Sequence, residues 1–225
     1  MKNILIADGD SDLATLLTQY LHSEGFTVTI ASDGELAIKM ALNQSFDAII
    51  MDVQLSKKNG FEVLKSIRQH SDIPVLIFTA ETDPIDCIVG LEIGADDYVT
   101  KPCNPRELII RLKAILRRAQ RAPASRPVIN YDHLTVNANQ RKAFISNSEL
   151  ELTNAEFNIL EILIKSPGQA FSKEELTEYA LGRKYTAYDR SIDVHISNLR
   201  NKLGENASGE PWLKTVRGFG YMFNK

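Results

Sequence analysis

The sequence predicts an α/β protein of two domains, in which a domain with a five-stranded parallel sheet precedes a small α+β domain. Between residues 1 and 119, short unbroken apolar runs alternate with amphipathic segments, which is typical of buried parallel strands joined by helices. Residues 120–127 form a polar linker with two prolines. From 128 to 225, period-two alternation of apolar and polar residues comes first and helical patterns follow, which indicates a small antiparallel sheet packed with helices.

The elements of the first domain follow from these apolar runs. The expected strands cover residues 4–7, 28–30, 48–51, 75–79 and 98–100, and the expected helices cover 11–24, 34–43, 61–69, 83–93 and 105–118. If the strand order is flavodoxin-like, 2-1-3-4-5, the ends of the first and third strands are neighbours. That order predicts that Asp8 lies beside Asp52, and that Thr79 and Lys101 reach the same rim.

This set of residues suits phosphoryl transfer. A carboxylate attacks a phosphoryl group directly, and an acidic cluster holds Mg²⁺ through oxygen ligands. A hydroxyl and an ammonium group neutralise the charge on the phosphoryl oxygens. Each residue alone also has an ordinary structural explanation, such as Asp52 acting as a turn residue, but four of them at successive strand ends favour a site.

Residues 1–118 resemble the receiver domain of two-component response regulators. The resemblance is carried by Ile-Leu-Ile-Ala-Asp8, Met51-Asp52 with Asn59-Gly60, Phe78-Thr79-Ala80, Gly94-Ala-Asp-Asp-Tyr98 and Lys101-Pro102. It implies a (βα)5 receiver in which a sensor histidine kinase phosphorylates Asp52. It also implies the remaining roles: Asp8 and Asp52 as metal ligands with the carbonyl of Gln54, Lys101 as a phosphate contact, and Thr79 with Tyr98 as the switch pair.

One departure from the receiver pattern concerns the metal. The family has two adjacent acids after the first strand, whereas this chain reads Asp8-Gly9-Asp10. Moving an acid by one position redirects its side chain, so Asp10 is expected to cap the helix that starts near residue 11. Weakened or absent Mg²⁺ binding is therefore predicted, and a receiver that regulates without phosphorylation remains an alternative. Ser56 replaces the usual loop proline, and Cys103 replaces the usual aromatic residue after Lys-Pro.

The second domain combines short strands with three helices. Strands are expected at 134–136, 143–145 and 150–152, and helices are expected to begin at Thr153, at Ser172 and near residue 189, the last one ending at Leu203. Thr153 with Glu156 three residues later is a capping box. Residues 212–223 form a hairpin with glycines and Arg217 at its tip. A helix followed by a basic β-wing indicates a winged-helix DNA-binding domain.

Residues 128–224 resemble the OmpR/PhoB winged-helix output domain. The resemblance is carried by Leu152-Thr with Glu156-Phe157, Arg190-Ser-Ile-Asp-Val-His-Ile196, Leu199-Arg200 with Lys202-Leu203, and Val216-Arg-Gly-Phe-Gly-Tyr221. It implies that the third helix enters the major groove of an operator and the wing enters the minor groove. The implied roles are base reading for Ser197 and Asn198, phosphate contact or helix support for Arg190, His195, Arg200 and Lys202, and a minor-groove probe for Arg217.

The receiver resemblance also implies a homodimer. The family pairs a face carrying Asp96, Asp97, Glu107, Arg111 and Arg118 in this chain. Cys87 stands where an arginine usually faces Glu107, which predicts that Glu107 lacks its partner and that the dimer is weakened. RNA polymerase is a further candidate partner of a transcription regulator.

Composition limits the other classes. The 225 residues are 44% hydrophobic with a net charge of −3, and no apolar run is long enough to span a membrane, so a cytoplasmic protein without membrane contact is expected. Cys87 and Cys103 form no CxxC pair, and the histidines have no zinc spacing. An FMN carrier or a hydrolase with an Asp nucleophile is the alternative from the enzyme class. The acidic stretch after the first strand disfavours the carrier, and a hydrolase leaves the winged helix without a purpose, so no enzymatic activity is predicted.

Overall fold

The computed structural model describes residues 1–81, 83–119, 128–186 and 189–224. The chain divides into two compact units, Met1–Leu116 and Arg117–Lys225. The expected linker, residues 120–127, lies outside the described residues. Across the part that is described, no helix is both long and apolar enough to cross a membrane.

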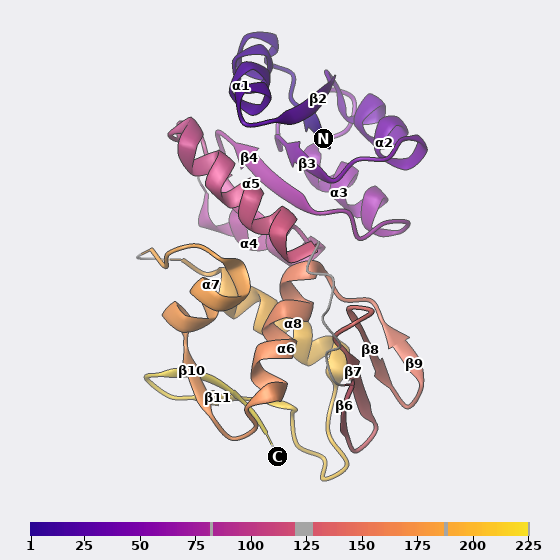
Figure 1. The fold of residues 1–225 in the computed structure, drawn as a ribbon, viewed down its shortest axis with the longest axis vertical. Helices are drawn as coiled ribbons and strands as arrows, with labels where there is room; N and C mark the ends of the chain where they lie inside the picture. Colours follow the sequence, from indigo (N-terminus) through magenta and orange to yellow (C-terminus); the bar gives the residue numbers. More distant parts are fainter. Residues whose placement is uncertain (82, 120–127, 187–188, 225) are drawn as a thin grey trace. The chain divides into compact units, whose positions relative to one another are not determined.

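The first unit is the predicted (βα)5 domain (Figure 1). Its elements are β1 Lys2–Ala7, α1 Ser11–Ser23, β2 Phe26–Ala31, α2 Gly34–Asn43, β3 Ala48–Met51, α3 Gly60–Arg68, β4 Val75–Thr79, α4 Pro84–Ile93, β5 Asp97–Thr100 and α5 Pro105–Ala119. The strands are parallel in the order β2-β1-β3-β4-β5. The predicted order is therefore confirmed, and β1 and β3 are neighbours.

The sheet is covered by helices because its strands are apolar on both faces. All four residues of β3 and all five of β4 are buried. One face packs against apolar residues of α1 and α5, including Leu17, Leu21, Leu112 and Ile115. Asp10 caps α1 by accepting hydrogen bonds from the backbone N–H groups of Asp12 and Leu13, as expected from the sequence.

The described residues of the second unit form two small antiparallel sheets and three helices. Its elements are β6 Val128–Tyr131, β7 Leu134–Asn137, β8 Lys142–Ile145, β9 Ser148–Leu150, α6 Asn154–Lys165, β10 Ala170–Ser172, α7 Lys173–Leu181, α8 Ser191–Leu203, β11 Leu213–Val216 and β12 Gly220–Phe223. One sheet has the order β6-β7-β8-β9 and the other β10-β12-β11. A single core of apolar residues from α6, α7, α8 and both sheets fills the space between them.

The wing is the hairpin of β11 and β12, which β10 joins on one side. Gly220 permits this junction, because a Cβ atom there would lie 2.0 Å from the carbonyl oxygen of Phe171. Gly218 adopts a φ of +73° in the turn, a conformation that glycine takes without strain. The two strands therefore close tightly and leave Arg217 exposed at the tip.

Candidate phosphorylation site and nucleic-acid interface

Two buried carboxylates and one ammonium group meet at the carboxyl end of the parallel sheet. Asp8 follows β1, Asp52 follows β3, and Lys101 follows β5. The Nζ atom of Lys101 lies 2.8 Å from Oδ2 of Asp8 and 2.7 Å from Oδ2 of Asp52. Only 4% of Asp8 and 7% of Asp52 is exposed, so this ammonium group neutralises part of a concentrated negative charge.

The protonation of Asp52 is fixed by competing effects. Burial raises the pKa of Asp52, but hydrogen bonds from Lys101, from Thr79 and from the backbone N–H of Gln54 outweigh it, so the net pKa lies below the usual Asp value. Burial lowers the pKa of Lys101, and its bonds to Asp52 and Asp8 raise it above the usual Lys value. Asp52 is therefore an ionised carboxylate, which is the form that acts as a nucleophile.

Gly9, the residue after Asp8, contributes no carboxylate, so the pocket has one acid fewer than the receiver pattern. A Cβ atom at Gly9 would have only the carbonyl oxygen of Ser32 within contact distance, at 3.8 Å. The Asp10 carboxylate is held at the start of α1 and does not replace the missing acid. Among the described residues there is no cluster of three His, Cys, Asp or Glu side chains with metal-binding geometry. Oxygen ligands from Asp8 and Asp52 suit a hard cation such as Mg²⁺, but with less charge than three acids provide.

The predicted switch residues lie beside this pocket. Thr79 ends β4 and is fully buried. Tyr98 is 9% exposed, and its hydroxyl donates a hydrogen bond of 3.0 Å to the carbonyl oxygen of Glu81. The side-chain amide of Gln54 donates to the carboxylate of Glu81 at 3.2 Å. The loop after β4 is thus bonded both to the tyrosine and to the residue two positions beyond Asp52.

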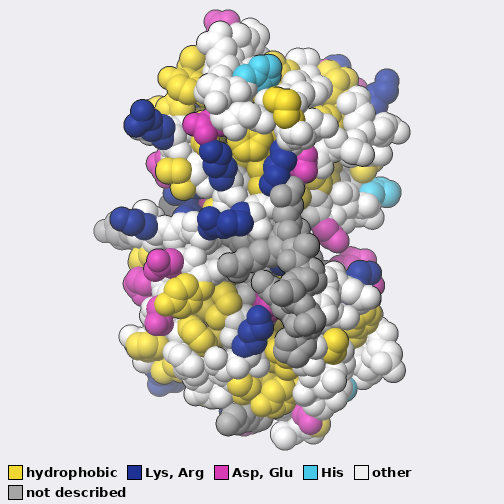
Figure 2. All heavy atoms as spheres, viewed as in Figure 1, with side chains coloured by type: hydrophobic (Ala, Val, Ile, Leu, Met, Phe, Trp, Pro, Cys, Tyr) yellow, Lys and Arg dark blue, Asp and Glu magenta, His cyan; other side chains and the backbone are white. Residues whose placement is uncertain are grey.

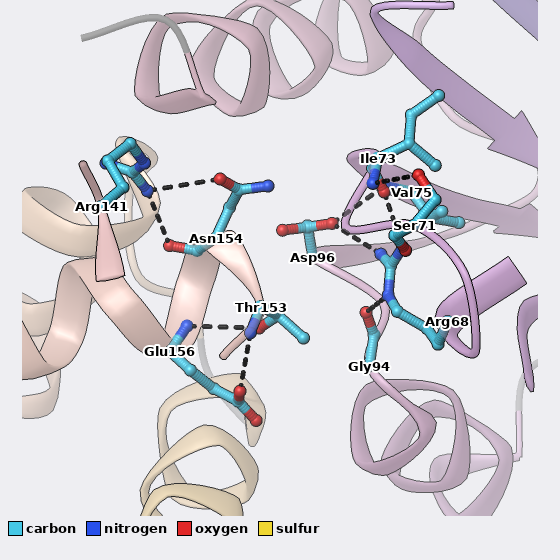
Figure 3. A network of polar contacts seen from close by, with 10 residues as sticks. All are labelled: Arg68, Ser71, Ile73, Val75, Gly94, Asp96, Arg141, Thr153, Asn154 and Glu156. Atoms are coloured by element: carbon cyan, nitrogen blue, oxygen red, sulfur yellow. Dashed lines mark hydrogen bonds and ion pairs between the residues drawn. The ribbon is translucent and has the colours of Figure 1, made fainter. Parts of the chain in front are cut away.

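Four of the five expected dimer residues form bonds within the chain. Asp96 is 1% exposed and accepts hydrogen bonds from Arg68 and from the backbone N–H of Val75 (Figure 3), which gives it a structural role within the chain, and its place on a dimer surface stays a prediction. Arg111 bonds both Asp97 and Glu107. Arg111, one turn along α5, thus pairs with Glu107 within the chain, and the loss of the partner of Glu107 across a dimer stays a prediction based on Cys87. The side chain of Arg118 lies outside the described residues.

The predicted DNA-reading helix is α8, and its side chains differ in exposure. Arg190 and Ser197 are exposed, and Asn198 is half-buried. His195 is fully buried, which favours the second of its two predicted roles, support of the helix from within, over phosphate contact. On the face that Figure 2 shows, Lys and Arg side chains are dispersed among acidic and apolar ones, so the cations that meet DNA must be identified individually.

Two basic residues of α8 are bonded to the rest of the unit. Arg200 donates to the carbonyl oxygen of Leu213 at 2.9 Å and to the hydroxyl of Thr215 at 2.8 Å, which ties α8 to β11. Nζ of Lys202 lies 2.7 Å from a carboxylate oxygen of Glu156 at the start of α6. Of the two predicted roles, this geometry favours helix support for both residues.

Sequence reasoning missed two acids that hold α8. Asp193 accepts hydrogen bonds from the hydroxyl of Tyr221 at 2.6 Å and from Lys173 at 2.8 Å. Glu156 was identified only as a helix cap. A signal existed for Asp193, because it lies seven positions before Arg200 and shares its face of the helix. No sequence signal connects Glu156 with Lys202, which is 46 residues away.

Comparison with known proteins agrees with this geometry. Residues 4–113 match the response regulator receiver domain, and residues 147–223 match the C-terminal domain of transcriptional regulatory proteins. The transcriptional regulatory protein CpxR of Klebsiella pneumoniae is 44% identical over 99% of this chain and 98% of its own length. CpxR of Escherichia coli K12 is 43% identical over the same shares. The structure of DrrB, a Thermotoga maritima OmpR/PhoB homologue, is 27% identical with a TM-score of 0.53 and full coverage of both chains.

A receiver domain followed by a winged-helix domain defines a DNA-binding response regulator. This chain belongs to the OmpR/PhoB family of response regulators.

Proposed function

We propose that Asp52 accepts a phosphoryl group from a sensor histidine kinase, and that this event controls operator binding by the second unit. The observation that carries the proposal is the bridge from Lys101 to both Asp8 and Asp52, which holds the carboxylate of Asp52 ionised at a strand end. An oxygen of Asp52 attacks phosphorus while the bond from phosphorus to the donor histidine nitrogen breaks. Lys101 then neutralises a phosphoryl oxygen, and the hydroxyl of Thr79 donates to another.

The pocket also supports a proposal about Mg²⁺. Asp8, Asp52 and the carbonyl of Gln54 would hold the ion, which when bound neutralises charge on the phosphoryl oxygens. Two carboxylates in place of three provide less attraction for a divalent cation, so we expect weaker Mg²⁺ binding than in receivers with a complete acid set. Lys101 already supplies one positive charge to the same two acids.

For DNA, we assign α8 to the major groove and the wing to the minor groove. The exposed positions of Ser197 and Arg217 and the half-buried Asn198 support base reading by these residues, with Arg190 as a phosphate contact. We divide the chain into a receiver at 1–119, a linker at 120–127 and a DNA-binding domain at 128–225. We further propose that the receiver forms a homodimer, that RNA polymerase is a partner on DNA, and that the protein acts in the cytoplasm, where kinase and DNA are both accessible.

Phosphorylation of the purified full chain with acetyl phosphate, with and without Mg²⁺, tests the central proposal. The expected product is a single base-labile acyl phosphate on Asp52, located by mass spectrometry after borohydride trapping, and absent from Asp52→Asn. Operator DNA selected from a random pool then reports whether affinity rises on phosphorylation. Phosphate on another residue, or operator affinity that does not change with it, contradicts the proposal.

A further inference from the structure

Glu156 is a buried carboxylate at the first turn of α6. Only 1% of the residue is exposed. Its Oε2 atom accepts a 2.9 Å hydrogen bond from the backbone N–H of Thr153, and its own N–H donates to the Thr153 hydroxyl at 3.3 Å (Figure 3). Its Oε1 atom is buried and has no hydrogen-bond partner within the described residues. The capping bonds therefore leave a negative charge that requires a cation.

Lys202 is the cation that Glu156 holds. Its Nζ atom lies 2.7 Å from Oε2, and it is the only cationic side chain bonded to Glu156 in the described part of the chain. Lys202 follows Asn198 by four positions on α8, so the two side chains share one stripe of the helix surface. The lysine side chain is still 36% exposed. It thus stands one turn beyond a predicted base-reading residue while its charge is directed into the protein.

Lys202 does not leave this bond without consequence. If its ammonium group turned to a DNA phosphate, the carboxylate of Glu156 would remain buried and charged with no cation beside it. Lys202 is also an anchor for α8, because its bond to α6 holds the C-terminal turn of the helix just as Arg200 holds it to β11. The pair therefore restricts both the position of α8 and the number of cations that α8 offers to any duplex.

We propose that Glu156 determines specificity by withholding Lys202 from the DNA backbone and by fixing the end of α8. Phosphate contacts supply most of the affinity for DNA of any sequence, so each cation that is withheld lowers non-specific binding and leaves more of the discrimination to base contacts. Glu156 acts through Lys202 and is a positioning residue. The inference rests on the proposed placement of α8 against DNA.

The test is the salt dependence of binding to a mixed-sequence duplex. Gln also completes a capping box at this position, so Glu156→Gln in the full chain keeps the cap and releases Lys202. The slope of log affinity against log salt should steepen by about 0.9. A fourfold rise in salt should then weaken binding by the variant about 3.5 times as much as it weakens binding by the natural chain. Preference for a selected operator over the mixed duplex should fall. Glu156→Gln with Lys202→Met should return the slope to that of the natural chain.

A matched control is Glu161→Gln, which removes the same charge from α6, where the carboxylate is paired with Lys165 of the same helix. Its slope should equal that of the natural chain. Two results overturn the inference. If Glu156→Gln leaves the slope unchanged, Lys202 plays no part in binding. If adding Lys202→Met makes the slope shallower than in the natural chain by about 0.9, Lys202 already contacts phosphate in the natural chain.

Lysine footprinting of the natural chain tests the same point without any variant. Lys202 should react slowly with an amine-directed reagent, and equally slowly with and without DNA. Protection that appears only with DNA contradicts the inference. If the Glu156 inference fails, Arg217→Ala shows whether the proposed function fails with it. A natural slope in Arg217→Ala would mean that the placement of the winged helix on DNA is wrong. A shallower slope in Arg217→Ala would mean that only the inference about Glu156 is wrong.

Discussion

Gly9→Asp is the substitution that examines the acid pocket most directly. The position accepts a side chain, because the nearest atom to a Cβ there is 3.8 Å away and the backbone of Gly9 is not in the left-handed region. Gly9 is also exposed, so a new carboxylate has access to water. The substitution therefore changes the charge of the pocket without forcing its neighbours to move.

The expected magnitudes follow from this geometry. Asp8, Asp52 and Lys101 leave a net charge of about −1, and a further carboxylate roughly 6 Å away at an effective dielectric constant of ~20 meets a repulsion of about 3 kcal/mol, which exposure reduces to about 1 kcal/mol. Replacing glycine reduces the conformational entropy of the unfolded chain, which offsets the repulsion by about 0.4–1 kcal/mol. Stability without metal should then change little. Mg²⁺ at 100 times its Kd should stabilise the variant by about 2.7 kcal/mol.

Thermal unfolding across a MgCl₂ titration measures this difference. For a receiver of this size, the Mg²⁺ effect corresponds to a rise in Tm of about 10 °C, reached at lower Mg²⁺ in Gly9→Asp than in the natural chain. Phosphorylation by acetyl phosphate should also become faster in Mg²⁺. Gly9→Asn is the control, since it adds a side chain of the same size without charge and should resemble the natural chain. Equal Mg²⁺ affinity in the natural chain and in Gly9→Asp would refute the reasoning.

Three other substitutions give further predictions. Arg217→Ala should weaken operator binding by about 1–3 kcal/mol and reduce A·T preference beneath the wing, as measured by gel shift on operators with altered flanks; an equal loss on all sequences would contradict minor-groove reading. Cys87→Arg should tighten the receiver dimer by no more than about 1 kcal/mol in sedimentation, because Glu107 already bonds within its own helix, and an unchanged dimer would argue against this surface. Asp189→Asn should lower stability at neutral pH by roughly 3 kcal/mol, because it breaks a buried pair with Arg183. Burial raises the pKa of Asp189, but the interaction with Arg183 lowers it by more, so the pKa in the folded protein lies below the usual Asp value. The difference in urea-unfolding free energy between the natural chain and Asp189→Asn should therefore shrink as the pH falls below 3.8, and a constant difference would contradict the assignment.

The fold of the first unit was largely predictable from the sequence because its strands are buried on both faces. Unbroken apolar runs mark such strands clearly, and each expected strand and helix is present with ends shifted by at most two residues. In the second unit, β6 and β10 were missed. β6 is exposed at Val128 and Asn130 and only partly buried at Ile129 and Tyr131, and β10 has three residues whose strand character comes from pairing with β12. Neither carries a periodic apolar signal of its own.

The candidate sites were predictable where topology alone brings residues together. Asp8, Asp52 and Lys101 meet because the strand order places their strand ends on one rim. Side-chain direction on α8 was harder to predict, since residues three and four positions apart share a face and the sequence does not say which face is buried. His195 was therefore placed on the DNA side although it is fully buried. Asp96 was placed on a dimer surface by resemblance to the receiver family, and its bond to Arg68, 28 residues away, gives no signal in the sequence.

The distribution of cations in the second unit bears on how DNA binding is controlled. Arg200 and Lys202 are bonded inward, whereas Arg190 and Arg217 are exposed and form no side-chain hydrogen bond or ion pair in the described part of the chain. With Arg190 at a phosphate and Arg217 in the minor groove, these two cations give a salt slope of at most about −1.8, which corresponds to weak binding by one chain. Pairing two chains on adjacent half-sites doubles the number of contacts and the slope to about −3.6. In the mechanism proposed above, operator occupancy should therefore depend steeply on the pairing of two receivers, so we expect phosphorylation of Asp52 to act on the assembly of two chains rather than through a change within α8.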